Sequence, residues 1–128
     1  MNGIVTYKLA VDVKPGYLHV VVTGQNSKEN VAQYLERLRR ECAARDCFRV
    51  LVEERLEGPR LETMDVFQIA SNGSERARGQ LMAIAYVDAN ADGGSMQFAE
   101  TVAVNRGLPV RVFSTVADAE EWLQSLDR

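Results

Sequence analysis

The sequence predicts a single α/β domain in which an N-terminal antiparallel hairpin is followed by successive βα units. Segments of strand-like apolar pattern alternate with segments of helical spacing after the hairpin, and no linker, internal repeat or low-complexity stretch interrupts them. A chain of 128 residues with 46% hydrophobic content is long enough for one core. We therefore expect one domain over residues 1–128, with a mixed, mostly parallel sheet of about five strands and four helices. Right-handed crossovers would place the helices mainly on one face, with the first strand as the antiparallel edge.

The hairpin is formed by VTYKLAVDV (residues 5–13) and YLHVVVTG (residues 17–24), which KPG connects. Pro15 presets φ at the second position of a type II turn, and Gly16 supplies the positive φ that the third position requires. His19 lies in the middle of the second strand with no partner apparent in the sequence. We expect it to be a structural or surface histidine.

The first helix begins near Asn26, which we expect to cap it with Glu29 three residues later. Cys42 and Cys47 match neither the C-x-x-C spacing of redox sites nor a zinc ligand set, so two free, buried or half-buried thiols are expected. The apolar residues at helical spacing predict a core-facing stripe of Val31, Leu35, Leu38 and Cys42.

FRVLVEE (residues 48–54) is predicted to be a buried strand, and residues 55–60 the loop after it. The second helix follows in LETMDVFQIAS, with Thr63 as its cap and an end at Asn72-Gly73, a natural helix stop. The inward residues of this helix are expected to be Val66, Phe67, Ile69 and Ala70.

LMAIAYV (residues 81–87) is apolar on both faces, as expected for a central strand. A third helix is expected from about Ser95, then a last strand in LPVRVFS (residues 108–114), and Thr115 with Asp118 forms a capping pair for the last helix. The expected inward residues of these two helices are Met96, Ala99, Val102 and Ala103, then Ala119, Trp122, Leu123 and Leu126.

Composition excludes several classes of function. The 18 acidic and 15 basic residues give a formal net charge of −3, so no field is strong enough to attract nucleic acid. No segment reaches the roughly 18–20 consecutive apolar residues that a membrane span needs. The N-terminus lacks the basic start and continuous apolar core of a secretion signal, so we expect a cytoplasmic protein.

The element order, together with FAETVAVNRGLPVRVFSTVADAEEWLQ near the C-terminus, resembles the SpoIIAA-like group. This group contains the STAS domains (sulfate transporter and anti-sigma-factor antagonist) and their relatives grouped with Sec14-type lipid-binding domains. The similar topology covers nearly the whole chain. The resemblance implies a regulatory or binding domain rather than an enzyme, without a cofactor. The most family-like residues are Phe113 before Ser114, the pair Asp118-Ala119, and Trp122-Leu123.

In the sigma-factor antagonists of this family, a partner kinase phosphorylates a serine where the third strand meets the second helix. The corresponding stretch here, residues 53–65, contains no serine. Its only hydroxyl belongs to Thr63, whose oxygen is more simply used to cap the helix, and Glu62 and Asp65 would crowd a phosphate there with like charge. The resemblance therefore implies a docking module that lacks the phosphorylatable serine motif.

Asp88, Asn90 and Asp92, followed by a glycine, resemble the first half of a calcium-binding loop. The bidentate glutamate of such a loop belongs at position 12, which is Ala99. Glu100 comes one residue later, and one residue rotates a helical side chain by about 100°. We therefore interpret this segment as a polar connection, and weak calcium binding is a less favoured hypothesis.

Catalytic patterns are missing from the sequence. The single histidine leaves no obvious base to activate a serine or cysteine, and no glycine-rich phosphate loop occurs. Glu53 and Glu54 are neighbours on a strand, so their side chains point to opposite faces and make a poor acid/base pair. The sequence predicts no enzyme and no metal site.

The expected binding site lies where the carboxyl ends of the strands meet the helix N-termini. Backbone N–H groups there can hold an anion, and Arg55 and Arg60 could add positive charge. That these loops are polar only because they are solvated remains an open alternative. The candidate ligand or partner residues are Glu54, Arg55, Arg60, Glu62, Thr63, Asp88, Asp92 and Ser95.

Two functions remain open from the sequence. The first is a non-enzymatic regulatory module that docks another protein and could pair with itself as a homodimer through its edge hairpin or sheet face. The second is a carrier that holds a small apolar or lipid-like ligand between helices and sheet, as the Sec14 similarity implies.

Overall fold

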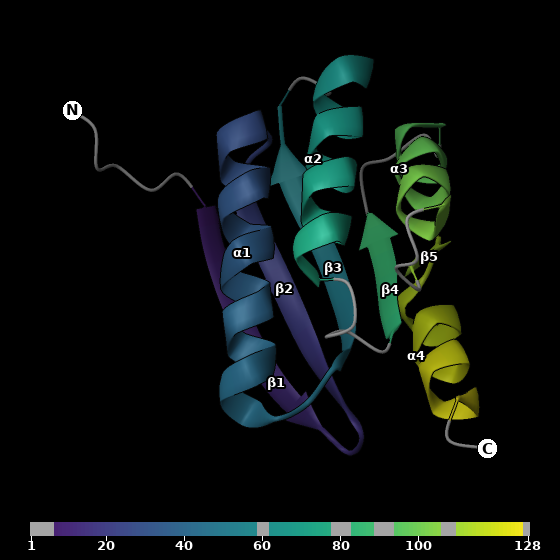
Figure 1. The fold of residues 1–128 in the computed structure, drawn as a ribbon. Coiled ribbons are helices and arrows are strands. Elements are labelled where there is room, and N and C mark those ends of the chain that lie inside the picture. The colour runs from purple at the N-terminus through teal and green to yellow at the C-terminus, as the bar shows by residue number, and fades with distance from the viewer. Residues whose placement is uncertain (1–6, 59–61, 78–82, 89–93, 106–109, 127–128) are drawn as a thin grey trace.

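The computed structural model describes residues 7–58, 62–77, 83–88, 94–105 and 110–126. Within these ranges the side chains of Thr63, residues 73–77 and residues 94–99 are outside the description. Five strands form one sheet with helices packed against it (Figure 1). The elements are β1 (Tyr7–Lys14), β2 (Tyr17–Gln25), α1 (Lys28–Arg45), β3 (Arg49–Glu57), α2 (Thr63–Ala77), β4 (Ala83–Asp88), α3 (Gly94–Asn105), β5 (Val110–Phe113) and α4 (Val116–Ser125).

The strands lie side by side in chain order, β1-β2-β3-β4-β5. β1 and β2 are antiparallel, and every later pair is parallel. The hairpin closes on the pair Lys14 and Tyr17, and Gly16 has φ of 87°, the positive value expected at the third position of the turn. The predicted α/β architecture, with a hairpin edge and successive βα units, is confirmed.

Two separate cores cover the two faces of the sheet. Val50 and Val52 of β3 point to the face that carries α1, where Leu38 and other α1 residues pack on them. Leu51, between them in the strand, points to the opposite face and packs with Leu123 of α4. The helices α1, α2 and α3 follow right-handed crossovers on the first face, and only α4 turns to the second. The expectation that most helices share one face is therefore confirmed.

A stripe of buried side chains packs α1 against the sheet, and it includes one residue that was not predicted from the apolar spacing. Val31, Leu38 and Cys42 are buried as expected, and Tyr34 between them is fully buried. Burial of the aliphatic side chains, Val31 and Leu38, contributes about 1.5–3 kcal/mol each to folding. Cys42 and Cys47 are both free, and burial raises the pKa of the Cys42 thiol to about 12, so this sulfur stays protonated.

The predicted boundaries of two elements were wrong. β3 continues through residues 55–57, which were expected to form a loop, because these residues pair in parallel with the end of β2. The strand ends at Gly58, whose φ of 112° suits glycine alone. α2 continues past Asn72-Gly73 to Ala77, since a glycine inside a helix costs only about 1 kcal/mol and does not by itself stop it.

Three side-chain predictions also need correction. Phe67 of α2 is 37% exposed and Leu126 is 36% exposed, although both were expected to face the core. Leu126 is the C-cap residue of α4, just beyond the helix that would have turned it inward. Ser27, and not Asn26, is the N-cap of α1, and its Oγ accepts a hydrogen bond of 3.1 Å from the backbone N–H of Asn30. The backbone N–H of Asn26 instead donates to the carbonyl of Glu57, at 2.7 Å.

We expect Ser27→Ala to lower the free energy of unfolding by about 1 kcal/mol, because it removes this cap from α1. Ser27→Asp keeps an oxygen acceptor at the same place and should remain within a few tenths of a kcal/mol of the natural protein. Urea unfolding followed by circular dichroism measures both variants. Equal losses for Ala and Asp would contradict the role of Ser27 as the cap.

Candidate functional site

A buried carboxyl group lies at the carboxyl end of β3, under the helical layer. Glu54 is only 7% exposed. The hydroxyl of Tyr34, from α1, donates a hydrogen bond to its Oε2, and the hydroxyl of Tyr86, from β4, lies 3.5 Å from the same oxygen. The two tyrosine hydroxyls also hydrogen-bond to each other. In the parallel register of β3 and β4, Glu54 is paired with Asp88. We call Tyr34, Glu54, Tyr86 and Asp88 the carboxyl–tyrosine cluster.

Glu54 and the two tyrosines of the cluster bind their protons tightly. Burial raises the pKa of Glu54 to about 7; the hydrogen bond from Tyr34 opposes this shift, and the nearby Asp88 carboxylate adds to it. Burial and the neighbouring Glu54 also raise the pKa values of Tyr34 and Tyr86 well above 10.0. Both phenols therefore remain protonated donors, and Glu54 titrates near neutral pH.

The neighbouring glutamate has the opposite environment on the other face of the sheet. Glu53 accepts a hydrogen bond of 2.7 Å from Nε of Arg55, and its Oε1 lies 3.0 Å from Nε2 of His19. Burial alone would raise the pKa of Glu53, but the hydrogen bonds from Arg55 and His19 outweigh it and lower the pKa below 4.5. The two glutamates thus point to opposite faces, as their positions in a strand predicted.

The structure brings together only some of the residues that the sequence suggested for a site. Glu54 and Asp88 are neighbours in the cluster. Arg55 lies on the opposite face, bound to Glu53, and so does not share a surface with Glu54. Arg60 and Asp92 lie outside the described residues. Among the remaining candidates, Glu62 is exposed just before α2. Thr63 was expected to cap α2 but is its first helical residue, and the Glu62 carbonyl accepts the first bond, at 3.0 Å from the N–H of Val66. Ser95 is the second residue of α3.

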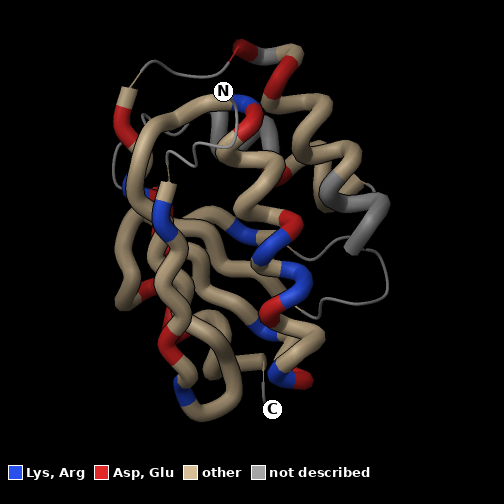
Figure 2. Tube along the Cα trace, turned by 90° about the vertical axis from the view of Figure 1, so that its left-hand side faces the viewer, with Lys and Arg blue, Asp and Glu red and all other residues tan. Residues whose placement is uncertain are grey.

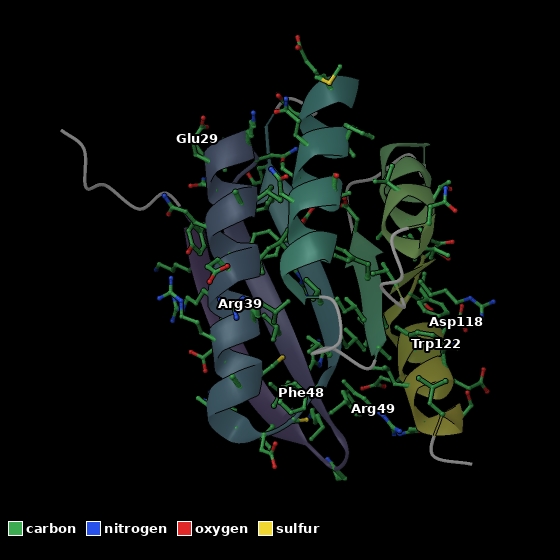
Figure 3. All side chains as sticks on the ribbon, in the orientation of Figure 1. Glu29, Arg39, Phe48, Arg49, Asp118 and Trp122 are labelled. Atoms are coloured by element: carbon green, nitrogen blue, oxygen red, sulfur yellow. The ribbon has the colours of Figure 1, made fainter. Side chains whose placement is uncertain are left out.

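The carboxyl ends of the strands and the beginnings of α1 and α2 form one rim of the molecule. Asp and Glu predominate at this end, where α1 and α2 begin, whereas many Lys and Arg lie along α1 and toward the opposite end (Figure 2). Glu29, at the start of α1, marks this rim, and Phe48 and Arg49 lie at the other end (Figure 3). Lys28 is held within the rim, with its Nζ 2.6 Å from Oε1 of Gln68 and 3.7 Å from Oδ1 of Asp65.

Large apolar side chains are exposed on the same rim, at the start of α2. Met64 is 62% exposed and Phe67, one helical turn later, is 37% exposed. Residues three apart on a helix are neighbours on its surface. Glu62 is exposed next to them in the chain. We call Glu62, Met64 and Phe67 the rim patch.

Metal binding finds no support within the part of the chain that the structure describes. No three His, Cys, Asp or Glu side chains of the described residues come together as they would around an ion. Asn90 and Asp92 of the calcium-like segment lie outside that part. Separately, none of the described helices combines the length and apolar character needed to cross a membrane.

The two tyrosines that define the cluster were not predicted from the sequence. Tyr34 falls between Val31 and Leu38 on the inward stripe of α1, and Tyr86 lies in the apolar segment of β4. A buried tyrosine hydroxyl usually has a hydrogen-bond partner. Applied to Tyr34, this rule indicates a polar partner on a strand that α1 covers. Glu54, near the end of the predicted strand 48–54, is such a group.

Among known proteins, no family model matches this chain, and no curated protein matches it significantly.

We expect Glu54→Gln to change the pH dependence of stability. The folded state holds the Glu54 proton more tightly than the unfolded state does, so Glu54 favours folding below about pH 4.5 and this contribution is lost as the pH rises to about 7. A shift of this size corresponds to roughly 3 kcal/mol. Glutamine resembles the protonated acid, so the free energy of unfolding of the variant, relative to the natural protein, should rise across this pH range. Urea unfolding at a series of pH values measures the difference.

Glu53→Gln is the matched control, because the same change is made one residue away. The pKa of Glu53 is lowered in the folded state, so its carboxylate stabilises the protein above about pH 4.5 and this contribution is lost as the pH falls through the lowered pKa. The variant should be destabilised at neutral pH and approach the natural protein in acid. The same pH trend for both variants would contradict the opposite environments of the two glutamates.

Proposed function

We propose that this protein is a non-enzymatic regulatory module, similar to STAS domains but without their phosphorylatable serine, that docks a partner protein on the rim patch. The observation that carries the proposal is the exposure of Met64 and Phe67 side by side at the start of α2. Exposed large apolar side chains that lie together and are surrounded by polar residues are typical of protein interaction sites.

The charge around the patch supports a particular kind of partner. Glu57 and Glu62 are exposed at the end of β3 and before α2, whereas Asp65, in the first turn of α2, is paired with Lys28. Acidic groups around an apolar centre favour a partner segment that carries lysine or arginine next to apolar residues. We therefore propose a basic and apolar segment of another protein as the occupant.

The carboxyl–tyrosine cluster favours a structural role over a catalytic one. A carboxyl group with a pKa near 7 can serve as a general acid, and such groups are frequent in active sites. However, Tyr34 is fully buried and Glu54 is 7% exposed, and each already holds a hydrogen bond from within the cluster. A catalytic group must reach its substrate, whereas this cluster fastens α1 to β3 and β4 beneath the rim.

The alternative of a carrier for an apolar ligand has less support. Between α1 and the sheet, where such a ligand would lie, Leu18, Val20, Val22 and Val52 are fully buried and pack together with residues of α1. Close-packed side chains of this kind leave little room for a ligand without rearrangement. The packing between α1 and the sheet therefore favours a docking module over a carrier.

We expect Met64→Lys to weaken binding of the partner by roughly tenfold or more, since it removes an apolar contact and adds a positive charge that repels a basic segment. The natural chain and the variant are used as baits in a lysate of the source organism, and the captured proteins are quantified by mass spectrometry. Val104→Lys is the matched control, because Val104 is 51% exposed near the C-terminal end of α3. A captured protein that is lost with Met64→Lys and retained with Val104→Lys supports the proposal.

The place of contact can be tested on the same complex. A zero-length reagent that joins carboxylates to amines should connect Glu57, Glu62 or Asp65 to lysines of the captured protein, in a segment that also contains apolar residues. Capture that is equal for all three baits, or cross-links confined to α4, would contradict docking on the rim patch.

A further inference from the structure

The strand β1 forms an edge of the sheet. It pairs with β2 along one side, and in the described ranges no other strand pairs with its second side. The edge of a strand presents backbone N–H and C=O groups that can pair with another strand. The side chains of β1 that are exposed are Lys8, Ala10, Asp12 and Val13, and Val13 is 65% exposed.

The hairpin geometry shows which backbone groups of β1 face outward. A two-residue turn closes on a pair that exchanges both backbone hydrogen bonds, here Lys14 and Tyr17. The alternation of an antiparallel ladder then directs the backbone groups of the even-numbered residues of β1 toward β2. The backbone N–H and C=O groups of the odd-numbered residues, from Tyr7 to Val13, point away from the sheet. These groups can pair with a further strand.

We propose that β1 pairs antiparallel with β1 of a second copy of this chain, about a two-fold axis that passes between the two Ala10 residues. In this register each Lys8 stands opposite Asp12 of the second copy, and each Tyr7 stands opposite Val13. Opposite charges and aromatic–aliphatic pairs that face each other across strands are stabilising. The outward backbone groups of the odd-numbered residues meet in hydrogen-bonded pairs, as the hairpin geometry requires.

Charge and the length of the paired segment together select this register from the others that a two-fold axis allows. Moving the axis to Val11 places Lys8 opposite Lys14, and moving it to Asp12 places two aspartates opposite each other. Moving it to Leu9 pairs only Tyr7–Val11 and leaves Lys8 opposite Ala10. Moving it to Val13 places Asp12 opposite Lys14, but only residues 12–14 of β1 then pair. Like charges directly opposite are destabilising, so of these arrangements the axis at Ala10 alone pairs opposite charges over most of β1.

A surface groove lies where the second copy would place an apolar side chain. Tyr7 points to the α1 side of the sheet, with its ring centre 6.5 Å from that of Tyr34. Val13 of the second copy would stand opposite Tyr7 on this same side, where the groove could receive it. The groove, of about 370 Å³, is lined by Tyr7, Ala32, Gln33, Glu36, Arg37 and Arg40.

Pairing about this axis would make one continuous sheet through both copies and direct their two rims to opposite ends of the dimer. The dimer would then present two rim patches, one on each end. Self-association rests on β1 and is independent of whatever the rim patch binds, so the tests of the two proposals succeed or fail separately.

Complementary charge reversals test the pairing. In a homodimer, Lys8→Asp places aspartate opposite Asp12 twice, and Asp12→Lys places lysine opposite Lys8 twice. Each variant alone should dimerise roughly tenfold or more weakly than the natural chain. An equimolar mixture of the two variants should dimerise again, because both cross-strand pairs become Asp–Lys. Sedimentation equilibrium from about 1 μM to about 1 mM measures each sample, and Glu121→Lys on α4 is a control with the same change of charge as Asp12→Lys.

The position of the axis is tested by one introduced cysteine, with the natural chain, which already contains Cys42 and Cys47, as the blank. Residues that face each other in a non-hydrogen-bonded antiparallel pair have Cα atoms about 4.5 Å apart, within the range that a disulfide needs. Ala10→Cys should therefore form a disulfide-linked dimer under mild oxidation. Lys8→Cys should not, since residue 8 faces residue 12.

Several results would overturn the proposal. The natural chain could remain monomeric at about 1 mM, beyond which an association is too weak to be specific. A dimer could form that the charge reversals leave unchanged, or that their mixture does not restore. Cross-linking of Lys8→Cys as readily as Ala10→Cys would place the axis elsewhere and contradict this pairing.

Discussion

The rest of this structure depends on the central strand β3, which is buried on both faces. Its backbone pairs in parallel with β2 and β4, and successive side chains alternate between the two cores. The register of this strand determines which helix each of its residues meets. A slip by one residue would exchange the two faces and move Glu54 from the tyrosines to the side of His19. The hydrophobic residues Val50, Leu51 and Val52 hold the register that places both glutamates.

The same alternation explains how two adjacent glutamates acquire opposite properties. On the α1 side, Glu54 meets phenol hydroxyls and the Asp88 carboxylate, with no cation among the partners that shift its pKa, and burial therefore favours the neutral acid. On the other side, Glu53 meets the guanidinium of Arg55 and the ring of His19, which favour the carboxylate. Glu54 thus keeps its proton inside the molecule up to about pH 7. It lies close to the rim, whose outer surface carries Met64 and Phe67. The buried cluster and the exposed patch lie at one end because parallel strands all end there.

The sequence predicted the fold well because its signals are local and periodic. Apolar alternation identified the strands, the Pro15-Gly16 turn identified the hairpin, and Thr115 with Asp118 identified the start of α4, where Thr115 accepts a hydrogen bond of 3.1 Å from the backbone of Asp118. The expectation that the segments after β3 and β4 meet at one rim is supported where residues are described, since Glu54 and Asp88 are paired. Element ends were less predictable. The extension of β3 to Glu57 depends on pairing with β2. The spacing of apolar residues within residues 55–57 does not predict this pairing.

By itself, the amino-acid sequence determined the order of strands and helices and most of the inward residues of α1 and α4, since these follow from backbone propensity and the spacing of apolar residues. Only the tertiary structure decided which polar groups meet. Tyr34, Glu54 and Tyr86 come from three different elements, and their contact depends on how α1 crosses the sheet and on the register of β3 with β4. It also decided that Arg55 is bound to Glu53 on the face opposite Glu54. Contacts between distant residues depend on how helices and strands pack, and this packing depends on several segments of the chain together.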